Sequence, residues 1–268
     1  MESERNSLLA LFDREMREHA RPDGPGVRVE RAGDVVRQVG AADDWNGVVW
    51  SAPGLDASGA DAAIAAQIAY FGSLGHGEFE WKVYAHDRPA DLPERLLAAG
   101  FVPEPPETLL VAPVASQPTT VELPEGIELR TVTDAAGVEL MGRAHERAFG
   151  TDWSRLGHQV LARLEESSDD ADSFVGVLAM AGEEPVSSAR MEFCPGTGFA
   201  GLWGGGTVEA WRGKGIYRAL VAFRAGIAAE RGYSHLHVDA SDQSAPILRR
   251  LGFSELSTTT PYVYRTAP

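Results

Sequence analysis

The apolar and polar positions in the second half of the chain predict alternating strands and helices. Residues 126–133 have the alternation of a strand, and residues 134–149 are typical of a helix with Asp134 as its N-terminal cap. The next segments are expected to form a helix (157–167), three strands separated by turns at Gly182 and Pro195-Gly196 (173–208), a helix (213–231), a strand (234–241), a helix (245–253) and a strand (260–265). This order predicts a mixed α/β layer.

The same order of elements closes both halves of the chain. Residues 79–111 and 235–264 each begin with alternating β-prone residues and pass through a polar turn into a short helix. The two helices end at Gly100-Phe101 and Gly252-Phe253, where a helix C-terminus favours a left-handed residue, and a strand-like run follows. We interpret this as an internal repeat.

A stretch rich in Pro, Ser and Thr lies between the halves. Residues 111–126, "VAPVASQPTTVELPEG", have no sustained periodicity and read as an extended linker. The sequence therefore predicts a domain at 1–111, a linker at 112–126 and a second domain at 127–268, each domain being of ordinary size.

Composition limits the class of protein. The chain has 268 residues and a net charge of −15, which argues against a general nucleic-acid or anionic-membrane binder. No apolar run approaches the roughly 20 residues of a membrane helix, and the first residues lack the pattern of a signal peptide. Cys194 is the only cysteine, so an internal disulfide is excluded. We expect a cytoplasmic protein.

The stretch "WGGGTVEAWRGKGIYRAL", residues 203–220, carries the strongest chemical signal. A glycine-rich strand end leads into a basic glycine turn and then into a helix. A P-loop is excluded because Gly215 follows Lys214 where Ser or Thr is required. A dinucleotide fingerprint is excluded because Arg218 occupies the third glycine position.

What is left is a turn that suits an anion. The amides of the first helical turn have no partner within the helix and carry partial positive charge. Arg212 and Lys214 add basic side chains, and Gly213 and Gly215 let the backbone approach a bulky group. A pyrophosphate fits this description.

These residues resemble the acetyl-CoA motif of the GNAT superfamily of N-acetyltransferases, written R/Q-x-x-G-x-G/A. Arg212 and Gly215 match, whereas Tyr217 stands where the family has Gly or Ala. The resemblance covers residues 127–265 and includes the strand, the helix and the Gly-Phe that follow. It implies two tandem GNAT-like domains, each a mixed, mostly antiparallel sheet flanked by helices, of which the first looks like a degenerate copy.

The resemblance implies how acetyl-CoA would bind. The pyrophosphate would rest on the turn amides, and the pantetheine arm would pair with the strand end like an added strand. The implied cofactor-binding residues are Thr207, Val208, Glu209, Arg212, Gly213, Lys214, Gly215, Ile216, Tyr217, Arg218 and Ser241. Gly204, Gly205 and Gly206 suit a bulge or bend at that point, or alternatively a tight turn.

Direct transfer to an amine needs a proton acceptor, and the leaving thiolate gains from an acid. The resemblance implies a carboxylate base, for which Glu192 and Glu209 are the candidates, although either equally suits a solvated edge. The family often places a Tyr acid where this chain has Leu248. Tyr262 is the candidate in its place, with Tyr217 and Tyr264 as alternatives, although a strand Tyr more often packs.

Other residues have plainer readings. His235 and His237 share a strand face but lack a third ligand, so no metal is expected. Cys194 reads as a turn or buried residue rather than a nucleophile. His145, Phe149 and Trp153 lie where acceptor sites of the family often form, but core packing is the simpler reading.

The sequence therefore predicts an N-acetyltransferase that uses acetyl-CoA and acts on a small-molecule or peptide amine. The alternative is a non-catalytic acyl-CoA sensor or binding module. Asp56 and Asp61 in the first half stand where a pyrophosphate would lie, and no Arg or Lys occurs between Arg37 and Lys82. We expect this half to bind no CoA. The sequence indicates neither the acceptor nor the oligomeric state.

Overall fold

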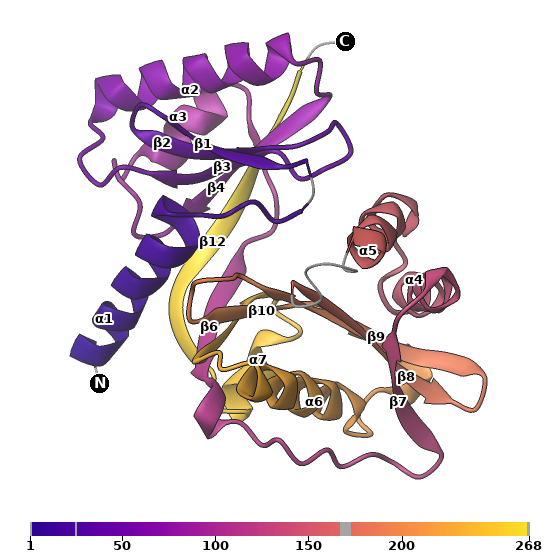
Figure 1. Ribbon diagram of the computed structural model, residues 1–268. Coiled ribbons are helices and arrows are strands. Elements are labelled where there is room, and N and C mark those ends of the chain that lie inside the picture. The colour runs from indigo at the N-terminus through magenta and orange to yellow at the C-terminus, as the bar shows by residue number, and fades with distance from the viewer. Residues whose placement is uncertain (1, 25, 167–172, 267–268) are drawn as a thin grey trace. The chain divides into compact units, whose positions relative to one another are not determined.

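The computed structural model describes residues 2–24, 26–166 and 173–266, and the chain divides into two compact units (Figure 1). Unit 1 comprises residues 1–110, 239–246 and 255–268, and unit 2 comprises residues 111–238 and 247–254. None of the helices in the described part of the chain has the length and apolar character needed to cross a membrane.

Unit 1 is a mixed sheet with helices. Its strand order is β1-β2-β3-β4-β12, in which β3 and β4 are parallel and the other pairs are antiparallel. The elements are α1 (Glu2–Phe12), the π-helical turn η1 (Asp13–Glu18), β1 (Arg28–Ala32), β2 (Val35–Val39), β3 (Gly47–Ser51), α2 (Ala57–Ser73), β4 (Glu78–Tyr84), α3 (Leu92–Ala98), β5 (Val102–Pro103) and β12 (Ser254–Arg265).

Aromatic side chains form the centre of the unit 1 core. Phe79 and Trp81 lie two residues apart on β4 and therefore share its inward face, and both are almost completely buried. Phe71 of α2 stacks on Phe79 with ring centroids 4.4 Å apart. Tyr262 of β12 belongs to the same hydrophobic cluster.

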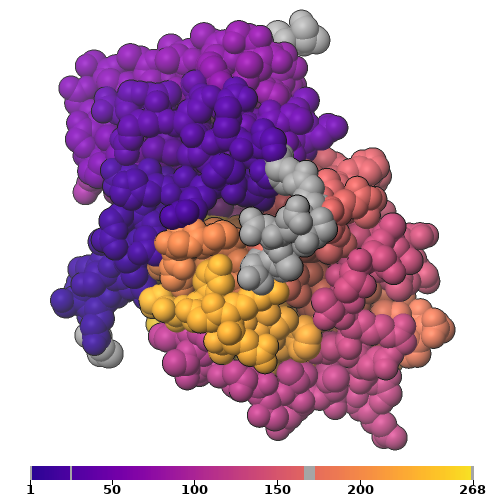
Figure 2. Space-filling view, viewed as in Figure 1, coloured from indigo at the N-terminus to yellow at the C-terminus, as the bar shows by residue number. Residues whose placement is uncertain are grey.

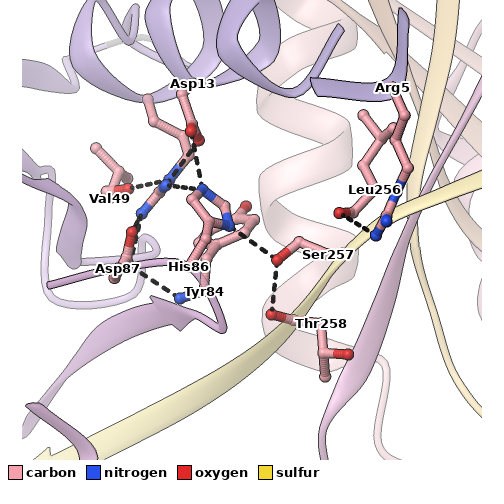
Figure 3. A network of polar contacts seen from close by, with 10 residues as sticks. Arg5, Asp13, Val49, Tyr84, His86, Asp87, Leu256, Ser257 and Thr258 are labelled. Carbon is pink, nitrogen blue, oxygen red and sulfur yellow. Dashed lines mark hydrogen bonds and ion pairs between the residues drawn. The ribbon is translucent and has the colours of Figure 1, made fainter. Parts of the chain in front are cut away.

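A buried arginine ties the N-terminal helix to this sheet, and Figure 3 labels the residues that it contacts. Arg17 of η1 is only 2% exposed, and its guanidinium donates to Asp13 at 2.7 Å, to both oxygens of Asp87 and to the carbonyl of Val49 at 3.1 Å. Its guanidinium carbon also lies 3.8 Å from the ring centroid of Tyr84. The charge is thus paired and hydrogen-bonded, as a buried ion requires.

The network around Arg17 continues to β12. His86 faces Asp13 Oδ2 through Nε2 at 2.8 Å and Ser257 Oγ through Nδ1 at 2.9 Å. Burial alone would raise the pKa of Asp13, but the bonds from His86 and Arg17 hold that pKa below its usual range. Residues far apart in the sequence are therefore locked together in unit 1.

A second polar cluster in unit 1 yields a pH prediction. Lys82 of β4 pairs with Asp239, and burial, reinforced by Asp239 and Glu80, raises the pKa of Glu107 to about 7 despite the nearby Lys82. A carboxyl whose folded pKa exceeds its unfolded value near 4.5 binds more protons when folded, so stability falls as pH rises between these values.

We therefore expect Glu107→Gln to remove part of the decline in stability between about pH 4.5 and pH 7. Urea unfolding at pH 5 and pH 8 measures the effect, and Glu78→Gln, on the exposed start of β4, is the control. Equal pH dependence in the wild type and Glu107→Gln would contradict the raised pKa.

Unit 2 contains the glycine turn. Its strand order is β6-β11-β10-β9-β8-β7, and β10 and β11 are parallel. Its elements, some of which begin or end in unit 1, are β6 (Glu107–Pro113), η2 (Val114–Ser116), β7 (Ile127–Val132), α4 (Ala135–Phe149), α5 (Ser154–Glu166), β8 (Phe174–Ala181), β9 (Glu184–Phe193), β10 (Phe199–Thr207), η3 (Glu209–Trp211), α6 (Ile216–Glu230), β11 (His235–Ala240) and α7 (Ala245–Arg250).

The predicted elements of unit 2 are present, with shifted ends. Asp134 caps α4 as expected, because its carboxylate accepts from the Gly137 amide at 2.8 Å. Helix α5 begins at Ser154 instead of Gly157, since Asp152 accepts from the Ser154 amide. Helix α6 begins at Ile216, not at 213, because Gly213 and Gly215 have positive φ angles.

The two Gly-Phe ends have the same hydrogen bonds. Phe101 donates its amide to the Leu96 carbonyl at 3.0 Å, and Phe253 donates to Leu248 at 3.1 Å. Gly100 and Gly252 both have φ near +90°, the conformation that an L side chain would strain. The repeated sequence pattern thus corresponds to a repeated helix end.

The units divide the chain differently from the sequence pattern. Strand β12 lies mainly in unit 1 because it pairs with β4 from Thr259 to Arg265. The predicted linker begins later than expected, since β6 continues to Pro113 and η2 follows it. The side chain of Gln117 then donates from Nε2 to the Leu251 carbonyl at 3.2 Å, within unit 2.

Candidate functional site

Strands β10 and β11 separate halfway along β10. They pair at Phe199–His235, Ala200–Leu236 and Gly201–His237, whereas β10 continues to Thr207. Beyond Gly201 the β10 backbone facing β11 has no partner in this ladder. An extended ligand can therefore add to this edge as a strand would.

The glycine run makes a bulge in the separated part of β10. Pairing with β9 shifts between Trp203 and Gly206, and Gly204 has a φ of 57°. Side chains fill the space beside the other two glycines: a Cβ on Gly205 would lie 2.9 Å from the Tyr217 ring, and one on Gly206 would lie 2.4 Å from the Phe149 ring. The bulge expected from the sequence is confirmed.

The turn after β10 presents backbone amides. Gly213 and Gly215 have φ angles of 74° and 87°, which turn the chain into α6. The Ala219 amide bonds the Gly215 carbonyl at 3.0 Å, so the preceding amides of α6, from Ile216 onward, come before the first bond of the helical ladder. This geometry suits an anion at the start of α6.

Two basic side chains of the turn, those of Arg212 and Lys214, contact neighbouring parts of unit 2. Arg212 donates from Nε to the Thr207 carbonyl and from Nη2 to the Ala148 carbonyl, both at 3.0 Å. Lys214 Nζ lies 4.5 Å from the ring centroid of Trp211. Arg212 thus fastens the turn to the end of β10 and to the last turn of α4.

Glu192 lies between two arginines. Its Oε1 accepts from Arg163 at 2.9 Å and from Arg190 at 3.1 Å. Burial alone would raise the pKa of Glu192, but the charges and hydrogen bonds of the two guanidinium groups hold that pKa below its usual range. The carboxylate is consequently stabilised in its ionised form.

The other candidate residues lie in different surroundings. Glu209 is exposed at the start of η3, and Tyr217 packs on the bulge at Gly205. Tyr262 lies in the unit 1 core, where burial raises the pKa of its hydroxyl. Ser241 begins the turn into α7, and its carbonyl accepts from the Ala245 amide at 2.9 Å.

Helices α4 and α5, whose residues lie on the face shown in Figure 2, place an aromatic group beside the bulge. Trp153 is 8% exposed and fits between Gly142 and Gly157, where a Cβ would come within 2.4 Å and 2.6 Å of its ring. His145 lies between Trp153 and Phe149, with centroid distances of 4.9 Å and 4.7 Å. Trp153 is therefore a packing residue, whereas Phe149 is half exposed.

Helix α2 of unit 1, which corresponds to α6, has a different N-terminal cap. The Asp56 carboxylate caps α2 by accepting from the Gly59 amide at 2.8 Å, so a carboxylate occupies the helix start. One expectation needs correction: Asp61 is neutralised, because Arg95 of α3 pairs with it at 2.8 Å. The sequence alone did not indicate this pair, because Arg95 lies 34 residues from Asp61. No cluster in the described residues has the His, Cys, Asp and Glu groups to hold a metal.

Sequence reasoning missed Arg224, which lies beneath the bulge. This α6 side chain is 1% exposed and donates from Nη1 to the Arg190 carbonyl at 2.8 Å. A signal was present, since Arg224 interrupts the apolar run "ALVAFRAGIAA". An arginine on the inward face of a helix must find polar partners in the core.

The separated strands, the bulge and the amide-rich turn together form the candidate site of unit 2. Residues 138–253 match the model of the acetyltransferase (GNAT) family. The second half of the chain therefore belongs to the GNAT acetyltransferase family. A search of the curated proteins gives no match.

Solved structures are similar over almost the whole chain. A GCN5-related N-acetyltransferase from Kribbella flavida has a TM-score of 0.69 and 20% identity over 96% of this chain and 94% of its own. One from Sphaerobacter thermophilus has a TM-score of 0.64 and 17% identity, over 88% and 78%. A tandem GNAT protein of the clavulanic acid pathway has a TM-score of 0.62 and 13% identity, over 98% and 95%. These likenesses establish a tandem GNAT-like fold.

Proposed function

We propose that this chain is an acetyl-CoA-dependent N-acetyltransferase that moves an acetyl group directly to a primary amine. The observation that supports this most strongly is the separation of β10 from β11 beside the glycine turn of α6. One feature offers a strand edge and the other offers helix amides, which are the two kinds of group that a pantetheine arm and a pyrophosphate require.

The proposed pyrophosphate site is the start of α6. The amides of Ile216, Tyr217 and Arg218 carry the partial positive charge of the helix N-terminus. Gly213 and Gly215 leave this approach open, and Lys214 and Arg218 add positive charge. Arg212 contributes by holding the turn to β10.

The proposed reaction takes place at the bulge. A backbone amide of the bulged strand would donate to the thioester oxygen as negative charge develops there. The amine nitrogen forms a bond to the carbonyl carbon while the carbon–sulfur bond breaks, and the thiolate leaves. Tyr262, the predicted acid, lies in the unit 1 core, and no acid is assigned here because a thiolate whose ordinary pKa is about 8.5 can leave without one.

Proton removal from the amine is assigned to a carboxylate, Glu209 or Glu192. A base works best when its pKa lies near the working pH. The two arginines hold the pKa of Glu192 low and occupy its carboxylate, which makes Glu192 a weak base. We therefore place the base at Glu209 first.

Gly215→Glu tests the pyrophosphate site. The new side chain brings a carboxylate to the anion site and strains a residue whose φ is 87°. We expect CoA affinity to fall by about tenfold or more, which corresponds to about 1.4 kcal/mol. Calorimetric titration measures it, with Gly232→Glu, at the far end of α6, as a control of equal charge and similar backbone strain. Unchanged affinity in Gly215→Glu would exclude this turn as the CoA site.

The degenerate first half predicts one CoA per chain. The start of α2 is capped by the Asp56 carboxylate, which leaves no favourable place for a pyrophosphate. The same titration on the wild type should give a stoichiometry of one. If the wild type bound two CoA molecules per chain and Gly215→Glu bound one, a second CoA site would exist away from the α6 turn.

A further inference from the structure

Arg224 is a buried cation that, among the described residues, donates hydrogen bonds to two backbone carbonyls. Its Nε donates to the Leu220 carbonyl at 3.0 Å and its Nη1 to the Arg190 carbonyl at 2.8 Å. A guanidinium has five N–H donors, and these two bonds use two of them. The group therefore retains donor capacity.

The charge of Arg224 has no carboxylate partner among the described residues. The charged and titratable groups that act on it are Tyr217 and Arg190, of which Arg190 is itself a cation. Burial, reinforced by Arg190, lowers the pKa of Arg224 to about 10, so the guanidinium stays charged at neutral pH. A buried ion without a counter-ion is destabilising, and an anionic ligand would offset that cost.

The position of Arg224 relates it to the acyl end of the proposed donor. It lies roughly 13 Å along α6 from Gly215, at about 1.5 Å per residue. Its Nη2 is 3.7 Å from the position that a Cβ on Gly205 would take. The guanidinium thus lies at the bulge, where the proposed function places the thioester, and away from the pyrophosphate turn.

We propose that the same site also takes a CoA thioester of a dicarboxylic acid, such as a succinyl group, and prefers it to an uncharged acyl group of equal length because its free carboxylate binds Arg224. This inference rests on the proposed function and names the class of acyl group. The amine attacks the thioester carbonyl, the carbon–sulfur bond breaks and CoA leaves as the thiolate. The amine proton passes to the base, and the acyl carboxylate is unchanged in the amide product.

Binding to the wild type gives a test that needs no variant. We expect succinyl-CoA to bind at least about tenfold tighter than butyryl-CoA, which has the same chain length without the charge. Calorimetric titration of succinyl-CoA, butyryl-CoA and CoA measures the difference. Equal affinities for succinyl-CoA and butyryl-CoA would overturn the proposal.

Variants assign the preference to one side chain. Arg224→Gln should abolish the preference for succinyl-CoA over butyryl-CoA while butyryl-CoA still binds. Arg224→Lys should keep part of this preference. Arg231→Gln, at the end of the same helix, removes an equal charge and should leave the preference intact. A preference that survives in Arg224→Gln would overturn the assignment. Failure of CoA itself to bind would instead contradict the proposed function.

Discussion

Arg17→Met should lower the free energy of unfolding by about 3–5 kcal/mol. The substitution removes one partner from an arrangement in which Asp13 and Asp87 both bond a guanidinium that is 2% exposed. Two carboxylates would be left beside a buried apolar side chain, and the Val49 carbonyl would lose its donor. Urea unfolding followed by circular dichroism measures the change.

Arg14→Met is the matched control for this experiment. Arg14 lies in the same π-helical turn, but its side chain is 56% exposed and its ion pair with Glu15 is 3.5 Å long. Surface pairs of this kind contribute about 0–1 kcal/mol. Similar losses in Arg14→Met and Arg17→Met would mean that the buried network does not anchor the N-terminal helix.

Glu209→Gln should lower the rate of acyl transfer by roughly a hundredfold or more while CoA still binds, because removal of a general base has about this effect. Glu192→Gln should lower it less, since its carboxylate is already held by Arg163 and Arg190. Product formation at saturating donor measures the rate, and calorimetry verifies binding.

Glu230→Gln serves as the control for these two variants, because it changes an exposed carboxylate at the far end of α6. It should turn over as the wild type does. Losses below threefold in both Glu209→Gln and Glu192→Gln would rule out a carboxylate base. Water would then have to accept the proton of the amine.

The elements of unit 2 could be predicted because their signals are local. The Asp134 cap, the glycines that end helices and the glycine bulge each depend on residues close together in sequence. Strand β12 shows the limit of such reasoning. Its last residues read as a strand, but only the pairing of Thr259–Arg265 with β4 assigns that strand to unit 1.

The candidate site was predictable to a similar degree. The glycine turn follows from its motif, because backbone conformation there requires glycine. The surroundings of each charged side chain do not follow, since they depend on long-range contacts: Arg212 bonds the Ala148 carbonyl, and Glu192 meets Arg163. Arg95 near Asp61 and Arg224 beneath the bulge escaped notice for the same reason.

The reaction proposed for this chain is the transfer of an acyl group from CoA to an amine. A mass-spectrometric screen tests it most directly, with acetyl-CoA and a panel of small amines, aminoglycosides, amino acids and peptides. We expect an N-acetylated product from at least one class of amine, formed by the wild type and strongly reduced in Gly215→Glu. Tight binding of CoA with no product from any amine would contradict it and indicate a non-catalytic acyl-CoA sensor.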